Sequence, residues 1–112
     1  SEEFAETLFK AMGKVTNIIE LIIDNNLIGK GIKFFGVTLE SNIHLSKFSL
    51  NNCRIDDVSF THLYEILKIN KSITNIDMQI NKVTDKSVNS LRFILNENSS
   101  IKCLNLLQNP LR

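Results

Sequence analysis

The sequence predicts an α/β solenoid, in which short parallel strands form one face and helices form the opposite face. Two observations favour this fold class. One apolar pattern of eleven residues occurs four times, and each segment between two copies carries apolar residues at helical spacing. Repetition at a period of roughly 20–50 residues is typical of repeat architectures. We therefore expect one domain, residues 1–112, in which stacked repeats share a continuous core.

The repeated pattern reads apolar-x-x-apolar-x-apolar-x-x-Asn/Cys-x-apolar. Its copies begin at residues 18, 45, 73 and 101, which are 27, 28 and 28 residues apart. The spacing predicts repeats at 1–17 (helix half only), 18–44, 45–72, 73–100 and 101–112 (strand half only). A terminal repeat normally carries a polar cap. None follows the last copy, so we expect the chain to be a fragment of a longer protein.

Each copy predicts a short strand, and successive side chains of a strand point to opposite faces. The side chains expected in the core are Leu21, Ile23, Phe48, Leu50, Ile76, Met78, Leu104 and Leu106. Their neighbours face outward on the concave side, which is the usual binding surface of a solenoid. The predicted partner-binding set, expected to be free of core contacts, is Glu20, Ile22, Asp24, Lys47, Ser49, Asn51, Asn75, Asp77, Gln79, Cys103, Asn105 and Leu107.

Charge and hydrophobicity are unevenly distributed within this set. Glu20, Asp24 and Asp77 could meet a basic patch on a partner. Ile22 and Leu107 are candidate apolar anchors, although single exposed apolar residues are common on protein surfaces. The set therefore favours a protein partner of unknown identity, and a solvated face that binds nothing is the alternative interpretation.

One position recurs where each strand ends, and it is occupied by Asn26, Cys53, Asn81 and Asn109. A buried amide at this turn can donate to and accept from backbone groups of adjacent repeats, and a thiol is a small, weakly polar substitute. We expect these four side chains to form a structural ladder. A second series lies at the helix ends, where we expect the left-handed conformation that Asn tolerates: Asn42, Asn70 and Asn98.

The intervening segments predict helices with a buried apolar stripe. Equivalent stripe positions are Phe35, Phe60 and Val88, followed by Leu39, Leu67 and Leu95. Two helix starts carry residues that can cap them, namely Asp56 with Asp57 and Thr84 with Asp85. The remaining helix starts more loosely, at Gly29 and Gly31. Residues 2–14 fit the helix of a preceding repeat, with a stripe of Leu8, Ala11, Met12, Val15 and Ile18.

The bulk composition indicates an ordinary globular chain without a cofactor. Its formal net charge of +1 and its scattered basic residues predict no nucleic-acid and no membrane partner. A run of about 18 apolar residues, as a transmembrane helix requires, is absent. Two cysteines and two isolated histidines, His44 and His62, match neither a disulfide framework nor a metal site nor a catalytic triad. We expect a cytoplasmic protein that is not an enzyme, with an oligomeric state that the sequence leaves open.

The four copies in register resemble the leucine-rich repeat, in its ribonuclease-inhibitor-like subclass, over nearly the whole chain. The resemblance implies a right-handed horseshoe with a parallel sheet on its concave face and helices on its convex face. It also implies a scaffold that binds another protein through the concave face.

Residues 44–84 are similar in rhythm to the repeat domain of tropomodulin-type actin-capping proteins. There a K-x-F-S-L strand, close to SKFSL here, leads to a helix that ends in K-x-N-K-x-hydrophobic, as in KINKSI. This narrower resemblance implies an actin or other cytoskeletal partner. Ran GTPase-activating proteins share the repeat class and use the rim of strand-to-helix loops, where Arg54 lies, although Asp56 and Asp57 offer Arg54 an ordinary salt bridge. A GTPase regulator and a purely structural spacer therefore stay open as alternatives.

Overall fold

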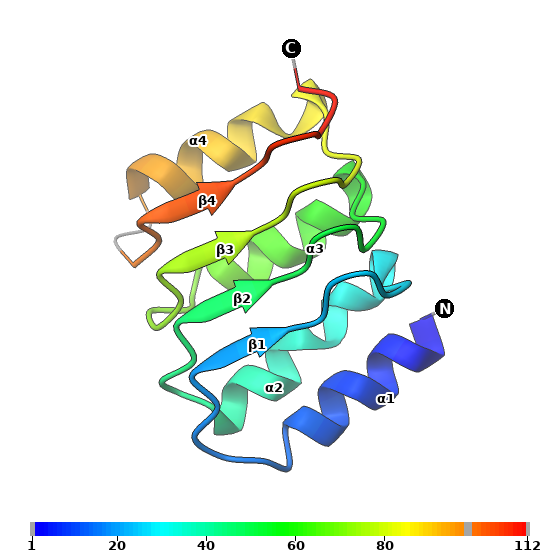
Figure 1. The fold of residues 1–112 in the computed structure, drawn as a ribbon. Coiled ribbons are helices and arrows are strands. Elements are labelled where there is room, and N and C mark those ends of the chain that lie inside the picture. Colours follow the sequence, from blue (N-terminus) through cyan, green and yellow to red (C-terminus); the bar gives the residue numbers. More distant parts are fainter. Residues whose placement is uncertain (1, 98–99, 112) are drawn as a thin grey trace.

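The computed structural model describes residues 2–97 and 100–111 and confirms an α/β fold of short repeats. Four strands of three residues alternate with helices along the chain (Figure 1). The elements are α1 (Glu2–Met12), β1 (Glu20–Ile22), the 3₁₀ helix η1 (Gly29–Phe34), α2 (Phe35–Ser41), β2 (Lys47–Ser49), α3 (Asp57–Leu67), β3 (Asn75–Asp77), the 3₁₀ helix η2 (Asp85–Ser87), α4 (Val88–Glu97) and β4 (Cys103–Asn105).

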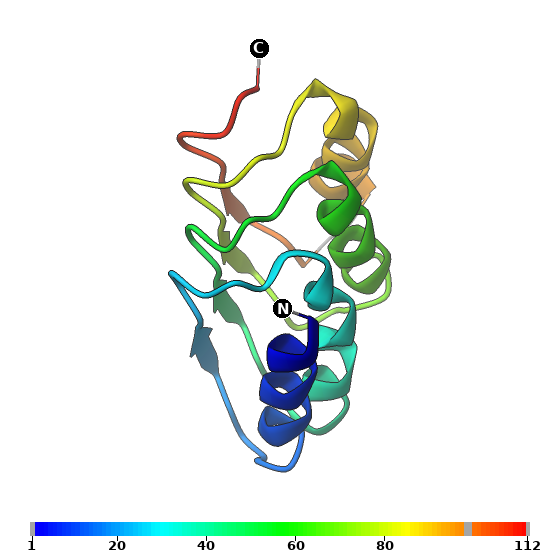
Figure 2. The same ribbon diagram turned by 90° about the vertical axis from the view of Figure 1, so that its right-hand side faces the viewer.

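The strands form one parallel sheet in the order β1-β2-β3-β4. Each strand pairs with the next in a constant register, so that Glu20, Lys47, Asn75 and Cys103 lie in one row across the sheet. The helices lie together on the other side of the molecule (Figure 2). The predicted solenoid is confirmed, because each repeat buries its strand against its own helix and against its neighbours.

The core lies between the sheet and the helices. In the first three copies of the pattern the side chains predicted to face inward are buried, and in the fourth copy Leu104 and Leu106 are partly buried. Three phenylalanine rings contact one another in this core. Phe35 stacks on Phe48 with ring centroids 4.0 Å apart, and Phe9 packs against Phe35 at a tilt, with centroids 5.5 Å apart. The prediction of the inward face is confirmed, because alternation along each strand decides which side chains leave water.

The stripe predicted for the N-terminal helix is wrong in part. Ala5 and Phe9 are the buried residues of α1, whereas Ala11 and Val15 are exposed. The remaining stripe positions are partly buried: Leu8, Met12 and Ile18. The helix packs against both η1 and α2 and ends at Met12. Its buried face is therefore set by these two neighbours, and Val15 falls in the turn beyond the helix.

Two stripe positions of α4 also differ from the prediction. Val88 and Leu95 are exposed, although their equivalents in α3, Phe60 and Leu67, are buried. Helix α3 has a helical neighbour on each side, while α4 has one on a single side within the described residues (Figure 1). Stripe residues on the outer side of α4 therefore stay in contact with water.

The predicted helix caps are confirmed for two helices. Asp56 accepts a hydrogen bond of 2.8 Å from the Ser59 amide at the start of α3. Thr84 accepts one of 3.2 Å from the Lys86 amide at the start of η2. The looser start at Gly29 is a 3₁₀ helix of six residues that continues into α2, not a single α-helix.

Asp57, the first residue of α3, joins two repeats. Its carboxylate accepts hydrogen bonds from the Thr84 amide (2.9 Å), the Thr84 hydroxyl (2.6 Å) and the Ser87 hydroxyl (2.6 Å). Burial alone raises the pKa of this carboxyl, but the hydrogen bonds from Ser87 and Thr84 together lower the pKa below its ordinary value. The ionised form of Asp57 is therefore stabilised by the next repeat.

Acidification should weaken the fold in part through Asp57. A carboxyl whose pKa is lowered by folding contributes stability above its unfolded pKa of about 3.9, and the contribution is lost as the pH falls through the folded pKa. We expect Asp57→Asn to be less stable than the wild type at neutral pH, with a difference that shrinks below about pH 4. Urea titrations at neutral and acidic pH measure it. Ser87→Ala, which removes one hydroxyl donor to Asp57, should converge with the wild type in the same way. A pH-independent difference would contradict the assignment.

Gly31 is required where η1 crosses α1. A Cβ atom at Gly31 would lie 2.3 Å from the Cβ atom of Ala5, closer than real Cβ atoms approach. Gly31→Ala should therefore lower the free energy of unfolding by about 1–3 kcal/mol, because η1 and α1 must move apart. Gly36→Ala is the matched control, since a Cβ atom there meets nothing within 4 Å and Ala favours a helix. Equal melting temperatures for the two variants would argue against the close contact.

Candidate functional site

The outward side chains of the four strands line a shallow groove of about 420 Å³ on the face of the sheet. The groove contains every residue of the predicted partner-binding set except Gln79 and Leu107. The strand register arranges its outward residues in two rows, which are Glu20, Lys47, Asn75 and Cys103, then Ile22, Ser49, Asp77 and Asn105. The structure therefore brings residues that are far apart in sequence onto one continuous surface.

The expectation that all these side chains are free is wrong for the end of the strands. The Asp24 carboxylate accepts hydrogen bonds from the Ser49 hydroxyl (2.6 Å), the Asn51 amide (2.8 Å) and the Asn51 side-chain amide (3.3 Å). Asn51 in turn accepts one of 2.6 Å from the Gln79 backbone amide. These backbone amides lie just beyond the strands, and short polar side chains of the preceding repeat satisfy them. Asp24 and Asn51 are therefore part of the scaffold.

The remaining charges of the groove are available to a partner. No ion pair joins Glu20, Lys47 or Asp77 to another group in residues 2–97 and 100–111. The Asp77 carboxylate accepts a hydrogen bond of 2.9 Å from the Gln79 side chain. Ile22 lies on β1, two residues after Glu20 and in the same row as Ser49 and Asp77, with 61% of its surface exposed. The groove thus offers carboxylates beside an apolar side chain, with Lys47 as its cation.

Asn81 shows what the recurrent position after each strand does. Its side-chain oxygen accepts hydrogen bonds from the Cys53 and Ile55 backbone amides, at 2.9 and 3.0 Å. Its side-chain nitrogen donates to the Leu50 carbonyl of the preceding repeat, at 2.9 Å, and to two carbonyls of its own turn. A single buried amide therefore connects two successive repeats.

The residues at the same position in the other three repeats form some of these hydrogen bonds. Asn109 donates to the Met78 carbonyl and accepts from the Val83 amide. The Cys53 thiol donates to the equivalent carbonyl of Ile23, at 3.2 Å. In this contact the thiol takes the place of the amide donor of Asn. A thiol does not replace the amide oxygen: the Ile28 backbone amide, which is equivalent to that of Val83, donates to the Asn26 carbonyl instead. The Asn26 side chain donates to carbonyls of its own repeat.

The left-handed backbone expected at the helix ends is found at the strand exits instead. Asn42 has a φ of −117°, and Asn70 is not among the residues with positive φ. Asn98 lies outside the described residues. Asn42 is buried and uses its side chain to bond Ile18, Met12 and Thr38. Positive φ recurs at one equivalent position after each strand, namely Asn25 (63°), Asn52 (54°), Ile80 (56°) and Gln108 (60°). Asn17, Gly29 and Arg54 have positive φ as well, outside this series.

Sequence reasoning missed this strand-exit series, although it precedes the Asn/Cys position by one residue in every repeat. Ile80 is its unfavourable member, because a β-branched side chain is strained at positive φ. Ile80→Asn should raise the free energy of unfolding by about 1 kcal/mol, since Asn tolerates this conformation. Ile80 is half exposed, so little buried surface is lost. The same change at the exposed Ile43, which does not have positive φ, should leave chemical denaturation unchanged; a stabilisation at both sites would reject strain as the cause.

The loop between β2 and α3 carries Arg54, the residue considered for a GTPase-directed role. Arg54 is exposed with a φ of 57°, and in the described ranges it has no ion pair with Asp56 or Asp57. The expected salt bridge is therefore wrong, because both carboxylates serve the helix starts. Within the same residues, no three His, Cys, Asp or Glu side chains are grouped as metal ligands. No helix among them is long and apolar enough to span a membrane.

The two cysteines occupy contrasting environments. Cys103 is exposed and belongs to the lining of the groove, whereas Cys53 is buried. Burial raises the pKa of the Cys53 thiol above its ordinary value, against the effect of hydrogen bonds from the backbone of Asn26 and Asn25. Cys103 is therefore a natural probe of the groove, with Cys53 as an internal reference.

The repeat length, the parallel sheet and the Asn or Cys side chain that recurs after each strand define the fold as a leucine-rich-repeat-like solenoid. No protein-family model matches it. The chain is similar to leiomodin-2 from Homo sapiens, with 30% identity over 74 residues, and to leiomodin-2 from Rattus norvegicus, with 28% identity over the same length. The matched segment covers 66% of this chain and 14% of each leiomodin-2.

Two solved structures share the fold. The tropomodulin C-terminal domain of Caenorhabditis elegans superposes with a TM-score of 0.70 and 21% identity, covering 95% of this chain and 64% of that domain. The structure of leiomodin-1 actin-binding site 2 gives a TM-score of 0.76 and 23% identity, covering 96% and 62%. The suspected resemblance to tropomodulin-like repeat domains is confirmed at the level of the fold.

Proposed function

We propose that this chain is a cytoplasmic protein-recognition module that binds actin through the groove on its sheet. The observation that supports actin is the similarity to leiomodin, seen both in sequence over 74 residues and in the fold of leiomodin-1 actin-binding site 2. The chain spans a small part of leiomodin-2, so the proposal concerns this repeat domain alone.

The geometry of the groove suits recognition of a protein segment. The bonds from Asp24 to Ser49 and Asn51 hold the strand ends in place before any partner arrives. Such preorganisation lowers the entropy lost on binding. Glu20 and Asp77 would pair with Lys or Arg side chains of the partner, and Ile22 would cover the aliphatic part of such a side chain.

The test combines binding with protection of Cys103. Purified actin with its own thiols blocked is titrated onto the chain, and binding is followed by fluorescence anisotropy. A maleimide then labels the complex, and mass spectrometry reads the modification of Cys103 and Cys53. We expect saturable binding, slower labelling of Cys103, and no labelling of Cys53 while the chain is folded.

Charge reversal identifies the surface. Glu20→Lys/Asp77→Lys should abolish binding. Lys68→Glu, directly after α3 and at the opposite side of the molecule, should leave it unchanged. If actin binds but Cys103 is labelled at the same rate as before, actin is a partner and the groove on the sheet is not its binding site. Absence of binding by the wild type would reject actin, and the spacer interpretation would then be preferred.

A further inference from the structure

A second groove, separate from the one on the sheet, lies between α2 and the end of α3, and it includes residues that directly follow α3. It has a volume of about 340 Å³ and is lined by Gly36, Leu39, Glu40, Ile66, Ile69 and Asn70. Ile69 is 80% exposed, the highest value among the exposed large apolar residues. A Cβ atom at Gly36 would meet no atom within 4 Å, so this side of the groove is open. The floor is therefore aliphatic and accessible from the helical face.

The charge of this groove has one sign. Glu40 is its charged lining residue, and it forms no ion pair within the part of the chain that the structure describes. Glu40 lies in the last turn of α2, which has no basic residue, so its carboxylate adds to the negative end of that helix dipole. Lys68 follows α3, but its ammonium lies 3.3 Å from Glu65 and 5.2 Å from the centre of the Tyr64 ring.

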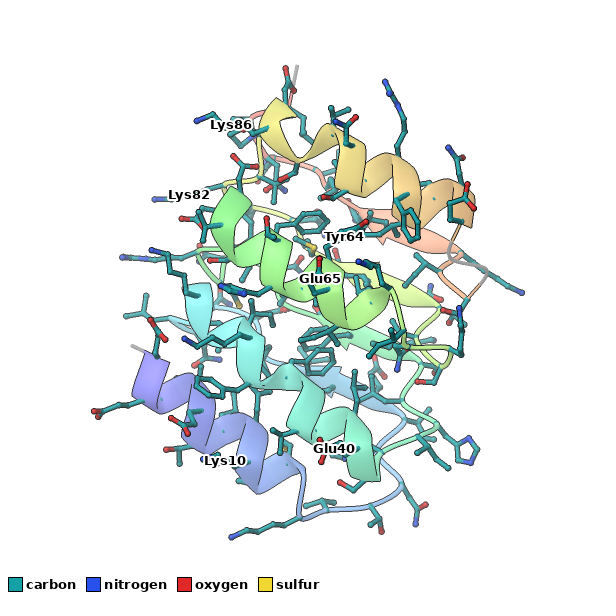
Figure 3. The ribbon with its side chains drawn as sticks, turned by 180° about the vertical axis from the view of Figure 1, so that it is seen from behind. Lys10, Glu40, Tyr64, Glu65, Lys82 and Lys86 are labelled. Atoms are coloured by element: carbon teal, nitrogen blue, oxygen red, sulfur yellow. The ribbon has the colours of Figure 1, made fainter. Side chains whose placement is uncertain are left out.

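The surroundings of Tyr64 show why Lys68 does not neutralise the groove. Tyr64 packs edge-on against Phe93 of α4, with ring centroids 5.7 Å apart. Lys68 is thus held on the side of α3 that faces α4. Figure 3 shows Glu40 on α2, and Tyr64 and Glu65 on α3. The apolar floor of the groove therefore has a carboxylate at one end, and none of its lining residues is positively charged.

We propose that this helical groove binds an amphipathic helix of a partner protein, which lays aliphatic side chains on Leu39, Ile66 and Ile69 and places a Lys or Arg beside Glu40. A helix fits because the site is a groove between two helices, the geometry in which apolar residues at i, i+3 and i+4 anchor a third. The cation is selected by the Glu40 carboxylate and by the negative end of α2.

The experiment uses two synthetic helical peptides with the same leucine stripe, one with Lys and one with Glu on its polar face. Fluorescence anisotropy measures their binding to the whole chain. We expect the Lys peptide to bind and the Glu peptide not to bind. Ile69→Ser and Glu40→Lys should each weaken the Lys peptide about fivefold or more, the order expected for an anchor residue. Glu40→Lys should in addition gain affinity for the Glu peptide.

Two controls separate this site from other surfaces. Ile43→Ser removes an equally apolar, exposed side chain outside the lining, and Glu20→Lys removes a carboxylate of the sheet groove. Both should bind the Lys peptide as the wild type does, and actin binding should be unaffected by Ile69→Ser. Equal binding of the two peptides, or equal losses in Ile43→Ser and Ile69→Ser, would overturn the proposal.

Discussion

Replacing Leu50 with Ala is expected to lower the free energy of unfolding by about 2–5 kcal/mol, because it leaves a cavity in a close-packed core. Leu50 is fully buried and belongs to the core cluster shared by the repeats. A domain of this size is stabilised by about 5–15 kcal/mol in total. The variant should therefore unfold at a much lower urea concentration.

Leu107→Ala is the matched control for Leu50→Ala. Leu107 is exposed, and truncating it should change the free energy of unfolding by less than about 0.5 kcal/mol. Circular dichroism during urea titration measures both variants. A midpoint for Leu50→Ala that equals the wild-type midpoint would remove Leu50 from the core.

Asn81→Leu is expected to have an effect of similar size, although the side chains have nearly the same volume. The change removes an acceptor from the buried amides of Cys53 and Ile55 and a donor from the carbonyl of Leu50. A buried polar group without a partner costs about 1–3 kcal/mol, so the total loss should reach about 3 kcal/mol or more. Urea denaturation measures the loss, and near-ultraviolet circular dichroism checks that the folded state is retained.

Asn26→Leu separates the bridging role of Asn81 from a general preference for Asn at this turn. The side chain of Asn26 bonds the carbonyls of Ile23 and Asp24, within its own repeat. The loss for Asn26→Leu should therefore be clearly smaller than for Asn81→Leu. Equal losses would show that the bridge between repeats does not contribute.

Much of the fold could be predicted because its signals are local. The alternation around Phe48 and Leu50 decides which side chains face the core, and the same rule places Glu20 and Lys47 on the open face of the sheet. The start of α3 could be predicted because Asp56 caps the helix through a hydrogen bond within its first turn. The repeat period connects these local patterns into a solenoid.

The errors concern residues whose environment is made by another element. Ala11 and Leu95 have suitable spacing for a buried stripe, but the position of a neighbouring helix decides whether they are covered. Ile80 shows the same limit for the backbone: nothing in a β-branched residue predicts positive φ, and the constraint comes from the turn that its repeat shares with the others.

The sequence by itself determined the repeat length, the order of strands and helices, and the face on which each strand residue lies, because these properties depend on periodicity within a few residues. The tertiary structure alone decided which polar residues of the open face are free. Asp24 and Glu20 are both acidic and both face outward, yet Asp24 bonds Ser49 and Asn51 while Glu20 lies exposed. The reason is physical. The backbone amide that donates to Asp24 belongs to Asn51 in the next repeat, 27 residues away, and the two groups come together only when the repeats stack.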